Sequence, residues 1–256
     1  MIDIERDVVA VVTINRPDVL NALDVPTLLE LEAAFDSLEG DELVRAIVVT
    51  GGGERAFVAG GDIADLNSRR GLDHYRQFAE VIHRVLRRIE CCPKPTVGAV
   101  RGWALGGGVE LLLALDLRVL ADEARLGVPE ITLGIFPGAG GTQRLLRQVP
   151  LCRAKELMFT GDPVTAAEAV ALGLANRVVP AAEVVGDAVK LAERVVRHSP
   201  LVLSLLKRTL AEGAEMPPSA ALAYEQAMIG LVFDSDDAHE GCSAFLERRP
   251  ANFKGA

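Results

Sequence analysis

The sequence is poor in the residues from which metal sites and disulfide frameworks are built. Its 256 residues include only four cysteines, four histidines and one tryptophan. No C-x-x-C pair occurs, and the adjacent Cys91 and Cys92 are badly placed for a disulfide framework, so we expect reduced thiols. The histidines do not cluster in sequence, and therefore no metal site is predicted.

Long apolar runs and basic runs are also missing. No stretch approaches the about 18 uninterrupted apolar residues of a membrane helix, and the N-terminus lacks the basic start and apolar segment of a secretory signal. The net charge is −9, which argues against nucleic acid as the main partner because phosphate binding needs clustered lysine and arginine. We therefore expect a cytoplasmic enzyme that binds neither membrane nor nucleic acid.

Hydrophobic residues, in contrast, make up 50% of the chain, enough for a sizeable core. Apolar and β-branched runs predict strands at residues 8–14, 44–50, 96–100, 117–121 and 175–179. Helical spacing predicts helices at residues 21–38, 72–89 and 166–172, and then at 182–197, 200–212, 218–233 and 235–246. We expect an α/β core over residues 1–195 and a helical region over 196–256.

A run of glycines opens the apolar helix that is predicted after Leu105. Gly106, Gly107 and Gly108 suggest a backbone that passes close to another group, and a helix start offers unpaired N–H groups to a developing oxyanion. The following Glu110 shares its helical stripe with apolar residues, so we expect a buried carboxyl with a raised pKa, a candidate proton carrier. A flexible loop and a first-turn glutamate favoured by the helix dipole are the alternatives.

A second glutamate, Glu130, is also enclosed by apolar residues, with no lysine or arginine three or four positions away. Pro129 suits the first position of a helix, so an ordinary first-turn carboxylate is an equally good interpretation. The segment 138–142 lacks the lysine of a phosphate loop, and no G-x-S-x-G motif occurs in the chain. The glycine-bearing bend 56–66 could place N–H groups against a ligand, although a plain turn explains it as well.

Together these segments resemble the enoyl-CoA hydratase/isomerase, or crotonase, superfamily, and the resemblance covers nearly the whole chain. The motifs that carry it are Asn15-Arg16-Pro17 with Asn21-Ala22-Leu23, Ala59-Gly60-Gly61-Asp62-Ile63, Gly106-Gly107-Gly108-Val109-Glu110, Pro129-Glu130 with Pro137-Gly138-Ala139-Gly140-Gly141-Thr142-Gln143-Arg144, and Phe245-Leu246-Glu247-Arg248-Arg249 with Asn252-Phe253-Lys254.

The resemblance implies a spiral of β–β–α turns followed by a helical trimerisation region, with assembly into a homotrimer or a hexamer built from two trimers. It implies an acyl-CoA substrate of the kind handled in fatty-acid β-oxidation and no cofactor besides the coenzyme A of the substrate. The implied oxyanion hole is formed by the backbone N–H groups of Gly61 and Gly107. The substrate-contact positions that it implies are Val19, Leu20, Ala59, Gly60, Gly61, Asp62, Ile63, Gly106, Gly107, Gly138, Phe253 and Lys254.

Both glutamates of the hydratases in this superfamily are matched here, so water addition to a trans-2-enoyl thioester is the favoured reaction. By the resemblance, Glu110 orients and deprotonates a water that attacks the β-carbon, and Glu130 delivers a proton to the α-carbon. Two other activities stay open. One is isomerisation of a 3-enoyl thioester or dehydration of a specialised hydroxyacyl-CoA. The other is a catalytically silent acyl-CoA or RNA-binding relative.

Some positions depart from the pattern or have a second interpretation. Asp18 stands where the family often has a basic residue near the coenzyme A phosphates, so Arg16 or another cation is expected to compensate. Trp103 either shapes an acyl pocket or, more simply, is a packed aromatic. The tail with Phe253 and Lys254 either reaches the adenine, often that of a neighbouring subunit, or is frayed.

Overall fold

The computed structural model describes residues 1–256 and contains a six-stranded sheet at its centre. Its strands lie in the order β1 (Ile2–Glu5), β2 (Val9–Ile14), β3 (Ala46–Gly51), β5 (Thr96–Val100), β7 (Leu117–Ala121) and β10 (Arg177–Val179). Only β1 and β2 pair antiparallel, and the other pairs are parallel. The central strands are buried on both faces, which explains their continuous apolar runs.

A second sheet of very short strands accompanies the first. Its order is β4 (Ala56–Val58), β6 (Trp103–Leu105), β8 (Arg125–Gly127) and β9 (Val164–Thr165). The pairs β4–β6 and β6–β8 are parallel, whereas β9 runs antiparallel to β8. Three successive strand pairs, β3–β4, β5–β6 and β7–β8, each add one strand to each sheet and are followed by a helical segment. This is the spiral of β–β–α turns that the family resemblance implied.

Helices surround the two sheets and connect their strands. The elements before β7 are η1 (Pro17–Val19), α1 (Val25–Glu39), α2 (Ile63–Asn67), α3 (Gly71–His74), the π-type turn η2 (Tyr75–Ala79), α4 (Glu80–Glu90) and α5 (Gly107–Ala114). Those that follow β8 are η3 (Pro129–Leu133), α6 (Gly141–Gln148), α7 (Leu151–Thr160), α8 (Ala166–Ala171), η4 (Ala181–Glu183) and α9 (Val184–Val195).

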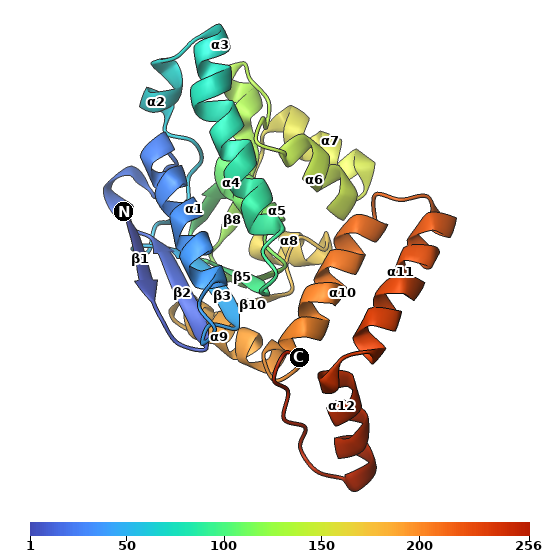
Figure 1. Ribbon diagram of the computed structural model, residues 1–256. Helices are drawn as coiled ribbons and strands as arrows, with labels where there is room; N and C mark the ends of the chain where they lie inside the picture. Colours follow the sequence, from blue (N-terminus) through green and yellow to red (C-terminus); the bar gives the residue numbers. More distant parts are fainter.

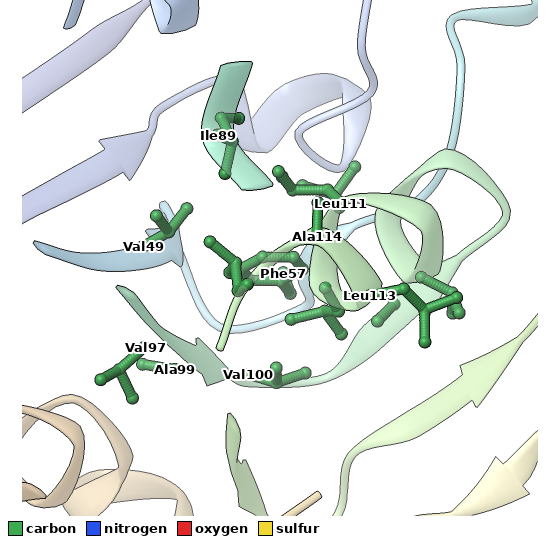
Figure 2. Packing of buried hydrophobic residues seen from close by; sticks show 14 of the residues in the cluster. Val49, Phe57, Ile89, Val97, Ala99, Val100, Leu111, Leu113 and Ala114 are labelled. Carbon is green, nitrogen blue, oxygen red and sulfur yellow. The ribbon is translucent and has the colours of Figure 1, made fainter. Parts of the chain in front are cut away.

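The core is centred on α5, and every residue of this helix is buried. Figure 2 shows Leu111 and Leu113 of α5 beside Phe57 of β4, close to Val49 and Val100 of the large sheet. The carbonyl groups at the end of α5 are bound by a buried arginine, because Arg118 donates to Leu112 and Leu115 at 2.6 and 2.9 Å. The helix is therefore fixed at its C-terminal end as well as along its sides.

Three helices follow the core and extend away from it: α10 (Pro200–Gly213), α11 (Pro218–Phe233) and α12 (Asp236–Glu247) (Figure 1). None of the residues of α10 or α11 is fully buried, although both helices are rich in leucine and alanine. Phe245 and Leu246 of α12 are 84% and 80% exposed. The division at residue 195 stays a prediction. No helix of the structure is long and apolar enough to cross a bilayer.

Two of the differences between the structure and the sequence prediction lie in the spiral turns. Strands β4, β6 and β8 were not predicted, because three residues are too few to show an alternating pattern. The helix predicted over residues 72–89 contains the π-type turn, which widens one turn of an otherwise continuous helical segment.

Candidate active site

The parallel pairing of β4, β6 and β8 brings three distant segments together. Each strand is followed within three residues by a candidate site residue: Gly61 after β4, Gly107 after β6 and Glu130 after β8. Because the strands are parallel neighbours, their carboxyl ends lie at one edge of the sheet, which is where ligands bind in open α/β sheets. The topology thus brings Gly61 close to Gly107, which is 46 positions further along the chain, and to Glu130, which is 69 positions further along.

The N–H groups of Gly61 and Gly107 lie side by side and are free. Leu23 N–H donates to Gly60, and Asp62 N–H donates to Leu23, so the N–H of Gly61 faces the opposite side. Gly107 is the first residue of α5, where the backbone N–H has no partner within the helix. A Cβ atom added to Gly107 would lie 3.4 Å from the Gly61 nitrogen. These two donors can bind one oxygen atom that carries developing negative charge.

Glu110 lies one turn further along α5 and is only 3% exposed. Its Oε1 accepts hydrogen bonds from the N–H groups of Ala139 and Gly141 at 2.7 and 2.8 Å. Gly141 begins α6, so the carboxyl also lies at the positive end of that helix. Burial raises the pKa of Glu110, and the N–H groups of Gly141 and Ala139 oppose that shift. The prediction of a buried proton carrier is consistent with this environment.

Glu130 is half-buried in the first turn of η3, directly after Pro129. Its Oε2 is buried and accepts no hydrogen bond from the chain. Burial, with the neighbouring charge of Glu110 as a smaller cause, raises the pKa of Glu130 to about 7. A carboxyl with this pKa keeps its proton in a substantial fraction of molecules near neutral pH, which an ordinary surface glutamate does not.

The two carboxyl groups have different surroundings. Glu110 receives two N–H groups at a helix start, which stabilise its charged form, whereas Glu130 receives none from another residue. Two acidic groups whose environments differ in this way are suited to opposite roles in proton transfer.

Apolar side chains close the space beside Gly61. A Cβ atom at Gly61 would lie 3.0 Å from Leu66 Cδ1 and 3.5 Å from Phe78 Cζ. Phe78 belongs to the π-type turn, is 7% exposed and stacks with His74 at 5.6 Å. Sequence reasoning missed Leu66 and Phe78 because their apolar spacing also fits an ordinary helix face.

The other predicted contact residues that precede the C-terminal tail lie on segments next to this site. Val19 and Leu20 end η1, and Leu20 accepts a hydrogen bond from the N–H of Ala59. Asp62 caps α2 through the N–H groups of its second and third residues, and Ile63 is exposed. Gly138 lies in the turn before α6, and this turn binds Glu110 through the N–H group of Ala139.

Phe253 and Lys254 lie away from the glutamates within the chain. The N–H groups of Lys254 and Gly255 donate to the buried Asp237 at 2.7 and 2.8 Å. This tie is incompatible with the interpretation of a frayed tail. Lys254 lines a cavity of about 330 Å³ together with Arg45 and Lys94, and neither Glu110 nor Glu130 lines that cavity. A single chain therefore does not bring the tail to the site.

Two further expectations need correction. The Arg16 guanidinium is 16% exposed and pairs with Asp24 and Asp62 at 2.9 and 3.4 Å, so it is not free to compensate for the exposed Asp18. Trp103 is 41% exposed on β6, so the interpretation as a packed aromatic is wrong. It faces outward because the neighbouring Ala104 takes the buried face of this strand.

Comparison with known proteins agrees with this geometry. The family model described as enoyl-CoA hydratase/isomerase matches residues 5–256. A short-chain-enoyl-CoA hydratase of Clostridium acetobutylicum is 41% identical over 241 residues, which cover 94% of this chain and 92% of that protein. A crotonyl-CoA hydratase of Syntrophomonas wolfei is 41% identical over 249 residues, covering 97% and 95%.

The crystal structure of an enoyl-CoA hydratase from Bacillus anthracis superposes on this chain with a TM-score of 0.95. The two are 35% identical, and the match covers 100% of this chain and 99% of that one. The fold and its site thus define an enzyme of the crotonase type. This chain belongs to the enoyl-CoA hydratase/isomerase family.

Proposed function

We propose that this enzyme adds water across the 2,3 double bond of a trans-2-enoyl-CoA thioester. The observation that carries the proposal is the pair of free N–H groups at Gly61 and Gly107 beside two carboxyls with raised pKa, of which only Glu110 accepts hydrogen bonds from the N–H groups of other residues. An enoyl thioester needs an electrophilic site for its carbonyl oxygen, a base for water and an acid for the α-carbon. This set of groups can supply all three.

The reaction proceeds as follows. The thioester oxygen accepts hydrogen bonds from the N–H groups of Gly61 and Gly107. These hydrogen bonds draw electrons from the conjugated double bond and make the β-carbon electrophilic. Glu110, whose charged form is stabilised by two N–H donors, deprotonates a water that attacks this carbon. The enolate that forms is held by the two N–H groups, where one donor is typically worth about 2.7–4 kcal/mol. Glu130 then donates its proton to the α-carbon.

A short acyl chain is the best-supported substrate. Leu66 and Phe78 lie beside Gly61, and we infer that they border the acyl group of a substrate bound there. Two of the relatives are named for short-chain enoyl-CoA and crotonyl-CoA. Crotonyl-CoA is therefore the substrate that we propose to test first, and a role in fatty-acid β-oxidation is consistent with it.

Self-association into a trimer, or a hexamer of two trimers, belongs to the same proposal. Helices α10 and α11 carry exposed apolar side chains, among them Leu210 at 65%, Leu222 at 65% and Phe233 at 59%. Exposed apolar surface of this kind marks an interface between proteins. A neighbouring subunit could also supply the tail with Phe253 and Lys254 to the coenzyme A, which the tail of the same chain does not reach.

Isomerisation of a 3-enoyl-CoA is the second candidate, because the oxyanion donors and a single base suffice for it. The raised pKa of Glu130 favours hydration, since it gives the site an acid as well as a base. The intact pair of glutamates also argues against a silent relative.

The test is turnover of crotonyl-CoA and of a 3-enoyl-CoA by the purified enzyme, followed by loss or gain of the conjugated thioester absorbance. We expect hydration of crotonyl-CoA to dominate, and both Glu110→Gln and Glu130→Gln to lower it by at least about a hundredfold. Turnover of only the 3-enoyl-CoA, or unchanged hydration in both variants, would overturn the proposal.

A further inference from the structure

The turn that binds Glu110 is itself held from behind by residues outside the reaction site. Its N–H groups at Ala139 and Gly141 donate to Glu110, whereas its carbonyl groups at Gly138 and Ala139 accept from other side chains. His83 on α4 donates from Nε2 to the Gly138 carbonyl at 2.8 Å. Arg144 on α6 donates from Nη1 to the Ala139 carbonyl at 3.1 Å.

The His83 contact acts on the same peptide group that binds Glu110. A planar trans peptide carries its carbonyl and its N–H on opposite sides, so fixing one fixes the direction of the other. The peptide between Gly138 and Ala139 contains both the oxygen that accepts from His83 and the N–H that donates to Glu110. His83 therefore sets the direction of one of the two donors of Glu110.

Arg144 holds the next peptide and is held firmly in turn. Its guanidinium forms two hydrogen bonds with the carboxylate of Glu90, at 3.1 and 3.0 Å, and its side chain is 14% exposed. Gly140 has a φ of 101°, and a Cβ atom there would lie 2.1 Å from Arg144 Nη1. Glycine at position 140 is thus what lets the guanidinium reach across the turn.

A turn of this composition needs such anchors. Residues 138, 140 and 141 are all glycine, which populates many backbone conformations when it is not held. We propose that His83 and the Arg144–Glu90 pair are positioning residues, which fix the peptide planes of this turn so that Glu110 Oε1 receives both N–H groups and Oε2 is left to meet the attacking water. This inference rests on the proposed hydration reaction only for the role of Oε2.

The electrostatic consequence can be measured. The ionisable groups that act on Glu110 or on its turn are Glu130 of η3, His83 and Glu90 of α4, and Arg144 of α6. Without the anchors we expect the N–H groups to turn away from Glu110, so that its charged form loses their stabilisation in addition to the smaller direct charge effects of His83 and Arg144. The pKa of Glu110 then rises further, and the pH below which hydration is lost rises with it.

The test compares variants that keep or remove each donor. His83→Leu removes the donor from an exposed position, whereas His83→Gln keeps an N–H group and serves as the conservative variant. Arg144→Met removes the second anchor. Arg84→Met is its control, because Arg84 of α4 forms a two-bond pair with Glu32 of α1, at 2.8 and 2.9 Å, without touching the turn.

Two measurements are made on each variant. The first is the pKa of Glu110, from difference infrared spectra against the Glu110→Gln protein over a range of pH without substrate. The second is the pH profile of crotonyl-CoA hydration. We expect His83→Leu and Arg144→Met to raise the pKa of Glu110, and with it the midpoint of the acidic limb of the pH profile, by about one pH unit. Both variants should also lower kcat about tenfold with little change in KM. His83→Gln and Arg84→Met should match the unsubstituted enzyme.

An unchanged Glu110 pKa in both His83→Leu and Arg144→Met overturns the inference, as does an equal shift in Arg84→Met. If Arg144→Met does not fold, the comparison of His83→Leu with His83→Gln decides the question. Failure of the proposed function is distinguishable, because the unsubstituted enzyme would then leave crotonyl-CoA unchanged while the infrared measurement still reports on the turn.

Discussion

The carboxyl of Glu130 lies directly against Gly106, the residue that precedes the helix carrying Glu110. Gly106 has a φ of 50°, and a Cβ atom there would lie 2.8 Å from Glu130 Oε1. The glycine turn therefore does two things. It begins α5 with free N–H groups, and it leaves room for the second carboxyl beside them.

Replacing Gly106 by alanine should consequently displace Glu130. We expect Gly106→Ala to lower kcat about a hundredfold or more and to destabilise the fold by about 1–3 kcal/mol, since alanine is strained at this φ. The measurements are steady-state kinetics and urea unfolding. Gly173→Ala is the matched control, because Gly173 also has a positive φ, of 81°, but its Cβ would meet nothing nearer than 3.9 Å. Equal losses of activity in the two variants would contradict this account.

The raised pKa of Glu130 should make stability depend on pH. The folded chain keeps this proton up to about pH 7, whereas an unperturbed glutamate loses it near 4.5. Between these values the folded state binds more protons than the unfolded state, so the free energy of unfolding falls as the pH rises. Denaturant titrations at several pH values should show that fall in the unsubstituted protein and a flatter dependence in Glu130→Gln. The surface variant Glu42→Gln should retain the fall, and identical curves for all three proteins would refute the assignment.

The apolar wall beside Gly61 should set the preferred acyl length. Truncation of Leu66, whose Cδ1 would lie 3.0 Å from a Cβ at Gly61, opens space next to the oxyanion donors. We expect Leu66→Ala to raise the kcat/KM for a six- or eight-carbon enoyl-CoA relative to crotonyl-CoA by about tenfold, the size of effect that one or two methylene groups have in an apolar pocket. Leu72→Ala, at a position 69% exposed, is the control. An unaltered preference in Leu66→Ala would place the acyl chain elsewhere.

Asp18 should weaken binding of the coenzyme A phosphates, since the Arg16 guanidinium already forms ion pairs with Asp24 and Asp62. Asp18→Lys is expected to lower the KM for crotonyl-CoA several-fold without changing kcat, and added salt should reduce this gain because exposed charges are screened. A crotonyl-pantetheine thioester, which lacks the nucleotide phosphates, should show no gain. A lower KM for both thioesters would mean that the lysine acts in another way.

The sequence was a good guide wherever one segment determines its own structure. The apolar stripe around Glu110 predicted a buried carboxyl on a helix that begins with glycine, and α5 has this form. The parallel strands β5 and β7 were found because both faces are buried and their apolar runs are continuous.

What the sequence did not reveal depends on contacts between distant segments. His83 and Gly138 are 55 residues apart, and nothing in the spacing of either predicts their hydrogen bond. The π-type turn that places Phe78 near Gly61 has the same apolar pattern as a regular helix. The outward orientation of the Trp103 side chain depends on the pairing of β6 with β4 and β8, and these strands were too short to be predicted.

The most direct test of the account is a crystal structure of the enzyme with an unreactive acyl-CoA. We predict the thioester oxygen at about 2.7–3.2 Å from the nitrogens of both Gly61 and Gly107, with the β-carbon facing Glu110 and the α-carbon facing Glu130. A thioester oxygen that contacts neither nitrogen, or an acyl group bound away from both glutamates, would contradict it.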